Sequence, residues 1–97
     1  MSERQPAVYI MVNKRNGTLY VGVTGDLITR VYQHKFMNNE GFTKKYNCRQ
    51  LVYYELHEEI TSAIEREKQI KAGSRKMKLA LIENLNSSWD DLYETLI

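Results

Sequence analysis

Apolar residues form short strand-like runs near the start of the chain and take up a helical spacing further on. The segment "AVYIMVNKRNGTLYVGVT" holds two such runs, 8–12 and 18–23, on either side of Asn16-Gly17. Branched and aromatic residues around an Asn-Gly pair predict a β-hairpin with a type I′ turn. A later run, "RQLVYYELH" at 49–57, is apolar on both faces and predicts a third strand that is covered on both sides.

The segment "TGDLITRVYQHKF" has the period of an amphipathic helix. Asp26 is a suitable N-cap, and Leu27, Ile28 and Val31 would lie on one side of this helix. A polar loop, "NNEGFTKKYNC", separates it from the third strand.

Three more helices are predicted after the third strand. The first begins at Thr61 or at Ser62, which could form a capping box with Glu65, and it ends at Gly73. The second begins after Ser74 and the short last one near Ser88. We expect these two to pack through their apolar residues, which are Met77, Ala80, Leu81 and Leu85 in one helix and Leu92 and Leu96 in the other.

The element order is therefore ββαβααα, without a repeat or a linker. It predicts an α+β fold in which a small three-stranded antiparallel sheet is flanked by helices. A chain of 97 residues is long enough for one core, so we expect a single domain over 1–97.

Composition places the chain among soluble globular proteins. The hydrophobic share is 42% and the charged share 27%. No apolar run is long enough to cross a bilayer, and the first residues lack the apolar core of a signal peptide. Cys48 is the one cysteine, which suits a reducing compartment and a structural role for this residue. We therefore expect a cytoplasmic protein without a membrane partner.

The net charge of +2 indicates little about binding partners, but the distribution of charge along the chain is more informative. Residues 66–78 carry six basic side chains and one acidic side chain, Glu67. Such a segment predicts a local basic surface for nucleic acid, with an ordinary solvated helix face as the alternative.

Glu67 occupies an unusual place on its helix. At 100° per residue, Glu67 falls about 40° from Ala63, inside the stripe that Ala63, Ile64 and Ile70 define. A carboxylate in a buried stripe must be paired or bound to a metal. It is either a functional group or one half of a structural salt bridge, for which Arg30 is a candidate partner. Lys71 lies on the flank of the stripe and could reach a phosphate.

Arg30 and His34 are four residues apart in the first helix, so they share a face beside its apolar stripe. The alternative is a surface arginine with an incidental histidine, and His57 is expected to be structural. No metal-finger spacing, phosphate loop or Ser/His/Asp set is present. The remaining polar candidates suit metal-assisted phosphodiester hydrolysis, and they are Tyr9, Tyr20, Arg30, His34 and Glu67.

An ordered set of motifs resembles the GIY-YIG nuclease superfamily. "AVY" stands 11 residues before "YVG", similar to the GIY and YIG triplets, and "YVGVTGDLITRVYQHK" is similar to the family's Tyr-Ile-Gly-x-Thr followed by an arginine and a histidine. The likeness continues through "LVYYE" and "AIEREKQIK" to "LIENLN" and resembles small stand-alone bacterial members. This sequence departs from the family's triplets at three positions, with Ala7 in place of glycine and Val8 and Val21 in place of isoleucine. The two valines keep the branched shape of the isoleucine side chain.

The resemblance implies roles for matching positions. Tyr9 and Tyr20 match the tyrosines of the two triplets, and Gly22 matches the glycine of the second, where the lack of a Cβ would let backbone or substrate approach. Arg30 matches the catalytic arginine and His34 the histidine one turn later. Asn84 and Asn86 both compete for the role of a late asparagine near the site.

The implied activity is that of a Mg²⁺- or Mn²⁺-dependent endonuclease. Glu67 would hold the ion, and Arg30 would stabilise charge on the phosphoryl oxygens. A tyrosine, in the first instance Tyr9 with Tyr20 orienting the water, would accept a proton. Because a free phenol with a pKa of ~10 is rarely ionised at neutral pH, this base needs help from the cation, Arg30 or His34.

Basic residues are the candidates for phosphate contacts. They are Lys35, Lys44, Lys45, Lys71, Arg75, Lys76 and Lys78. Phe42 and Tyr46 could stack on bases, or could pin their loop to the core. Family nucleases usually gain specificity from an attached domain, so we expect low sequence preference, structure-dependent cutting, or a protein partner that supplies the target.

Three functional hypotheses follow. The first is a metal-dependent endonuclease acting on DNA, with RNA as a further substrate. The second is a nucleic-acid-binding module of the same fold that cleaves little or nothing. The third, a protein-interaction domain, requires a large exposed apolar surface around Trp89 and Leu92.

Overall fold

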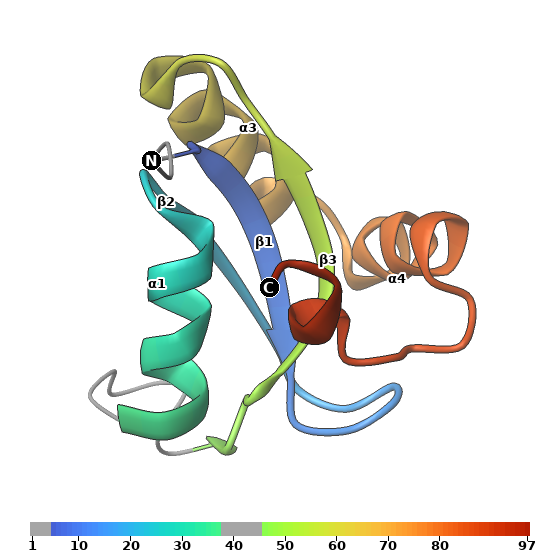
Figure 1. The fold of residues 1–97 in the computed structure, drawn as a ribbon. Coiled ribbons are helices and arrows are strands. Elements are labelled where there is room, and N and C mark those ends of the chain that lie inside the picture. Colours follow the sequence, from blue (N-terminus) through green and yellow to red (C-terminus); the bar gives the residue numbers. More distant parts are fainter. Residues whose placement is uncertain (1–4, 38–45) are drawn as a thin grey trace.

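A computed structural model describes residues 5–37 and 46–97 (Figure 1). The first three elements are β1 (Ala7–Val12), β2 (Leu19–Thr24) and α1 (Leu27–Tyr32). The others are a π-helical turn η1 (Gln33–Met37), β3 (Gln50–Leu56), α3 (Ile60–Ala72), α4 (Arg75–Leu85) and a 3₁₀ turn η2 (Leu92–Thr95). The predicted order is confirmed. In the described ranges, no helix has the length and apolar character needed to cross a membrane.

The three strands form one antiparallel sheet in the order β2-β1-β3. Tyr9 is opposite Gly22 on β2 and Tyr54 on β3, and the register with β3 shifts after Ile10. All six residues of the central strand β1 are buried. This strand is therefore covered on both faces, which explains why its sequence is apolar at every position.

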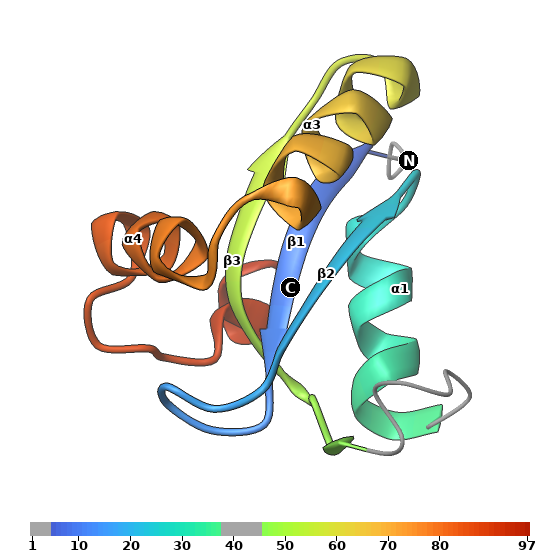
Figure 2. The same cartoon turned by 180° about the vertical axis from the view of Figure 1, so that it is seen from behind.

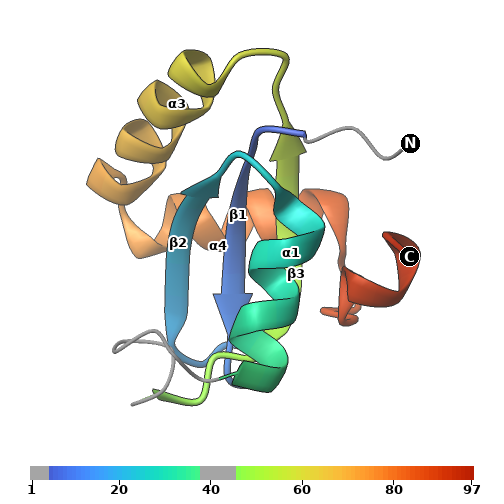
Figure 3. The same ribbon diagram turned by 60° about the vertical axis from the view of Figure 1, so that its left-hand side comes forward.

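Helices cover both faces of the sheet (Figure 2). The α1 side holds Ala7, Tyr9 and Met11 of β1, packed against Leu27 and Val31. The opposite side holds the alternate residues of β1 under α3 and α4. Figure 3 shows α3 crossing on the side of β2, one of the two edge strands of the sheet, so that α1 and α3 flank this strand.

The turn between β1 and β2 differs from the prediction. A type I′ turn needs positive φ at both central residues, whereas Asn16 has a φ of 58° and the described glycines have none. The last pair of the hairpin is Val12–Leu19, so the connection is longer than two residues. Gly17 N donates to the Lys14 carbonyl at 2.9 Å, and Thr18 N donates to the Asn13 side chain at 2.9 Å. The asparagine side chain, rather than a second left-handed residue, closes this turn.

The predicted helix ends are confirmed in part. Asp26 and Ser74 accept hydrogen bonds from Thr29 N and Met77 N, and Gly73 is the C-cap of α3. The capping box at Ser62 is wrong, because α3 begins earlier, after Glu59, which makes no side-chain cap bond. The Ser62 hydroxyl lies inside the first turn and donates to the Glu59 carbonyl.

The last short helix also begins later than predicted. It starts after Asp91, not at Ser88, because the Asp91 carboxylate accepts a hydrogen bond from Tyr93 N.

Two apolar stripes are narrower than predicted. Ile64 on α3 is 37% exposed, and Ile28 on α1 is also exposed. On α4 the buried residue is Ile82, which was not among the predicted packing residues, while Leu85 is exposed. The short helices touch the sheet along a single line of residues, so neighbours about 100° around the helix stay at the surface.

Trp89 is buried and packs against the core under α4. Its indole nitrogen donates to the Glu83 carboxylate. The interaction-domain hypothesis required this ring to lie in an exposed apolar surface, and the structure does not meet that condition.

Candidate active site

Two tyrosines and a histidine from three elements form a compact ring cluster. The Tyr9 hydroxyl lies 2.8 Å from His34 Nε2, and their ring centres are 5.6 Å apart. Tyr20 lies edge-on to His34 at 5.4 Å and 6.2 Å from Tyr9. Tyr9 is 0% exposed and His34 1%, whereas Tyr20 is half-buried. The predicted meeting of these three residues is therefore observed, with Tyr20 as the outermost ring.

Gly22 makes room for this cluster. A Cβ on Gly22 would lie 2.5 Å from both Cζ and the hydroxyl oxygen of Tyr9, closer than real Cβ contacts. The two residues are partners across β1 and β2, so the Tyr9 ring crosses directly over the glycine. The sequence predicted that backbone or substrate would use this space, but a tyrosine ring occupies it.

The first helix supplies His34 through its π-helical continuation. α1 passes into η1 at Gln33, and His34 is the buried residue of that turn. Arg30 is half-buried one turn earlier, near the end of α1. The helix is oriented by Val31 and Leu27, which pack against β1.

Glu67 is paired with Lys71 one turn further along α3. Lys71 Nζ lies 2.8 Å from the Glu67 carboxylate, whose side chain is 12% exposed against 56% for the lysine. The hydrogen bond with Glu67 raises the pKa of Lys71, and the Tyr20 hydroxyl contributes a smaller electrostatic rise. One of the two alternatives for Glu67, a salt bridge, is thus observed, and the partner in it is Lys71.

Tyr20 and Lys71 line the same small hollow. This hollow, which we call the site hollow, has a volume of about 280 Å³ and lies along β2 between Leu19 and Val21. Lys71 also binds Glu67 and Tyr20 also contacts His34, so these two lining residues link the hollow to the carboxylate on α3 and to the ring cluster. Residues from four elements therefore converge at the β2 edge of the sheet.

The donor set fits a weakly held oxygen-loving ion. Among the described residues, no three acidic, histidine or cysteine side chains form a group that could hold a metal by themselves. Mg²⁺ does not need such a group, because it keeps several waters and binds through one or two carboxylates together with substrate phosphates. Glu67 is the residue here that would hold it.

Several predicted phosphate-binding residues lie elsewhere. The Lys35 ammonium forms an ion pair with Asp91 and donates to the Arg49 carbonyl at 3.0 Å, which ties η1 to the C-terminal segment. This geometry gives it a structural role, and we leave it out of the proposed site. Lys76 is exposed on α4, while Lys44 and Lys45, like Phe42, lie outside the described residues.

The two candidate asparagines differ in their surroundings. Asn86 is buried, and its amide nitrogen donates to the carbonyls of Val52 and Asp90 at 3.1 and 2.8 Å. Its amide oxygen accepts from Asp90 N at 3.1 Å. Asn86 is thus committed to holding the C-terminal segment against β3, whereas Asn84 is exposed.

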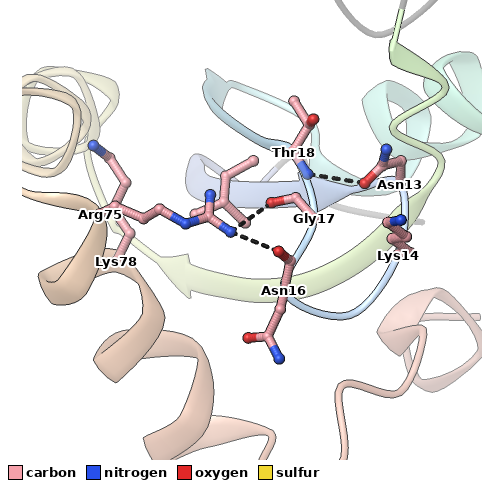
Figure 4. A pocket seen from close by; sticks show the side chains of 8 residues that line it. Asn13, Lys14, Asn16, Gly17, Thr18, Arg75 and Lys78 are labelled. Atoms are coloured by element: carbon pink, nitrogen blue, oxygen red, sulfur yellow. Dashed lines mark hydrogen bonds between the residues drawn. The ribbon is translucent and has the colours of Figure 1, made fainter.

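A larger hollow next to this site was not predicted from the sequence. It measures about 650 Å³ and lies between the β1–β2 turn and the start of α4 (Figure 4). Lys14 and Thr18 line it from the turn, and Arg75 and Lys78 line it from the helix. In the sequence, this hollow corresponds to the two asparagines and the basic residues of "NKRNGT", a segment that by itself predicted only a turn.

The sequence comparisons place this fold in a class of nucleic-acid-cleaving domains. Residues 5–80 match the family of the GIY-YIG catalytic domain, to which this chain therefore belongs. A UPF0213 protein of Staphylococcus saprophyticus is 37% identical over 75 residues, covering 76% of this chain and 92% of the relative. A UPF0213 protein of Staphylococcus aureus is 38% identical over 76 residues, covering 78% and 92%. No solved structure gives a significant match.

Proposed function

We propose that this protein is a divalent-metal-dependent endonuclease that cuts DNA with little sequence preference. Membership of the GIY-YIG catalytic domain family supports nuclease chemistry on nucleic acid in general. The observation that carries the finer proposal is the site hollow, which Tyr20 and Lys71 line while Lys71 holds Glu67. A phenol and a cation therefore border one hollow, and the acidic ion ligand Glu67 is joined to it through its ion pair with Lys71.

We assign to Tyr20 the role of accepting a proton from the reacting water. Its ring is half-buried and borders the site hollow, whereas the Tyr9 hydroxyl is enclosed against His34. This assignment exchanges the roles that the sequence suggested for the two tyrosines. Tyr9 and His34 become positioning residues that hold the Tyr20 ring from behind, through the contacts of 6.2 and 5.4 Å.

Two cations serve the phosphate. The half-buried Arg30 on α1 offers a planar fork of donors, which suits the charge that develops on phosphoryl oxygens. Lys71 attracts a phosphate into the site hollow, where its exposed side chain reaches solvent. When bound at Glu67, the metal supplies Lewis-acid stabilisation of the leaving oxygen.

The first test is cleavage of labelled single-stranded, duplex and branched DNA with Mg²⁺, Mn²⁺ or EDTA. We expect Glu67→Gln to abolish cutting while DNA binding persists, because the amide cannot hold the ion but keeps the shape of the side chain. Lys68→Gln, an exposed change on the same helix, is the control and should cut normally. Equal cutting by wild type and Glu67→Gln would show a contaminating nuclease and favour the non-catalytic binding module.

Two conservative variants separate the tyrosines. Tyr20→Phe should lower the cleavage rate by about 10²–10⁴-fold, the usual worth of a positioned proton-transfer group. Tyr9→Phe should lower it less and shift the pH–rate profile, because it removes the hydroxyl that contacts His34. The reverse order of effects would return the proton-accepting role to Tyr9.

A further inference from the structure

The hollow beside the hairpin turn, the turn hollow, has the lining of an anion site. Three cationic side chains line it, Lys14, Arg75 and Lys78, and no acidic residue of the described ranges 5–37 and 46–97 does. In the described part of the chain, none of the ion pairs takes up these three cations. Its remaining polar lining comes from asparagine and threonine side chains, which can also bind phosphate oxygens.

The wall of the turn hollow is braced. Arg75 reaches from α4 across to the turn, and its Nη2 donates to the carbonyls of Asn16 and Gly17, both at 2.8 Å (Figure 4). Lys78 Nζ donates to the Gly73 carbonyl at 2.8 Å, so its ammonium is anchored at the hollow. Thr18 N is held by the Asn13 side chain. A site whose donors are already held loses less freedom when a ligand binds.

The turn hollow continues into the site hollow. Leu19 and Lys78 line both of them. A path therefore runs along the edge strand β2 from Tyr20 and Lys71, past Lys78, to Lys14 at the turn. Lys71, Lys78 and Lys14 place positive charge along this path, which extends from the site hollow toward the turn.

We propose that the turn hollow binds the sugar-phosphate backbone of the nucleic acid on one side of the cut. This inference rests on the proposed function and specifies its substrate, a strand that continues past the cleaved bond. None of the described residues that line the turn hollow is aromatic and could stack on a base, so we assign its contacts to phosphates, which carry no sequence information. The low sequence preference then has a structural source.

Lys14 is the residue to change. Its side chain is exposed, and the hydrogen bond that it makes within the turn uses its backbone carbonyl, so Lys14→Gln preserves the fold. In a Glu67→Gln background, binding of labelled oligonucleotides is measured against salt concentration. The slope of log affinity against log salt is negative, and we expect its magnitude to decrease by about 0.7–0.9, the value for one lost phosphate contact. The matched control is Arg49→Gln, an exposed change outside the basic segment 66–78 at a residue whose contact to Lys35 uses the backbone carbonyl, and it should leave the slope unchanged.

A second arm tests the direction. Oligonucleotides are shortened from either side of the mapped cut, and cleavage by Lys14→Gln is compared with wild type. The penalty of the variant should disappear for substrates shortened on one side and persist for those shortened on the other. An equal penalty for both series, or a Lys14→Gln slope like that of wild type, would overturn the inference and leave the nuclease proposal standing. Absence of metal-dependent cutting would remove the nuclease proposal, and the binding arm would still decide whether the turn hollow holds nucleic acid.

Discussion

At the scale of single residues, the site depends on the missing Cβ of Gly22 as much as on the side chains that form it. The Tyr9 ring needs the space over this glycine to reach His34. A buried tyrosine hydroxyl also needs a hydrogen-bond partner, which His34 provides. The cluster therefore depends both on the open space at Gly22 and on the Tyr9–His34 contact.

Gly22→Ala should disrupt the site without touching a polar group. The new Cβ would lie 2.5 Å from the Tyr9 ring, so the ring must move and its contact with His34 is lost. We expect a loss of about 1–3 kcal/mol in the free energy of unfolding, the range for overpacked cores, together with a loss of cleavage. Chemical denaturation and the DNA-cutting assay measure the two effects.

Gly25→Ala is the matched control, because a Cβ there meets no atom within 4 Å. It should be close to wild type in both measurements. A Gly22→Ala protein that is as stable and as active as Gly25→Ala would show that the Tyr9–His34 contact is not needed.

At the scale of elements, a polar network fastens β3 to α3. Glu55 on the strand accepts hydrogen bonds from Arg66 Nε and Nη2 at 3.0 Å and from the Tyr53 hydroxyl. His57, expected to be structural, contacts Glu55 and the Ser62 hydroxyl at 3.4 and 3.1 Å. The long side chain of Arg66 reaches from α3 back to Glu55 on the strand. The network sets the position of α3, and with it that of Glu67.

This network predicts a pH dependence of stability. Burial raises the pKa of Glu55, but the hydrogen bonds from Arg66 and Tyr53 outweigh it and leave the pKa lowered from 4.5. A lowered pKa in the folded state means that the stabilisation is present above the unfolded value and is lost as the pH falls through the folded value. Glu55→Gln should therefore cost about 1.5–3 kcal/mol at pH 7, as for hydrogen bonds to a charged group, and less at pH 3.

Urea denaturation at both pH values measures this difference. Glu65→Gln, an exposed change on α3, should show no comparable loss at either pH. A cost of Glu55→Gln that is equal at pH 7 and pH 3 would contradict the role of the ionised carboxylate.

At the scale of the whole molecule, the C-terminal segment closes the fold against β3. Asn86 holds it on one side through three hydrogen bonds, and Asp91 holds it on the other through Lys35 and Leu51 N. Trp89 and Tyr93 from this segment enter the cores on the two faces of the sheet. The segment therefore joins two layers that the sheet separates.

Asn86→Ala should destabilise the whole molecule. It leaves the buried carbonyl of Val52 without its hydrogen bond, so we expect a cost of about 1–3 kcal/mol in the free energy of unfolding. Cleavage at a temperature where the variant is folded should stay normal, because the Asn86 amide is used in structural bonds. Thermal unfolding and the cutting assay measure the two effects.

Asn84→Ala is the comparison, since Asn84 is exposed at the same end of α4. It should not lower stability. A loss of cutting in Asn86→Ala below its unfolding temperature would contradict the purely structural role and give the late asparagine a part in the site.

The sequence by itself determined the features that depend on near neighbours in the chain. The hairpin, the caps at Asp26 and Ser74 and the end of α3 at Gly73 follow from local backbone preferences, and the ordered motifs identified the family. The tertiary structure decided the features that depend on distant residues. It enclosed Tyr9 against His34 and left Tyr20 at the surface, and it paired Lys35 with Asp91, 56 positions away. The burial and the ion pairing of a side chain depend on the residues that pack against it in the folded protein. Because these residues are distant in the sequence, the spacing of neighbouring residues does not predict them.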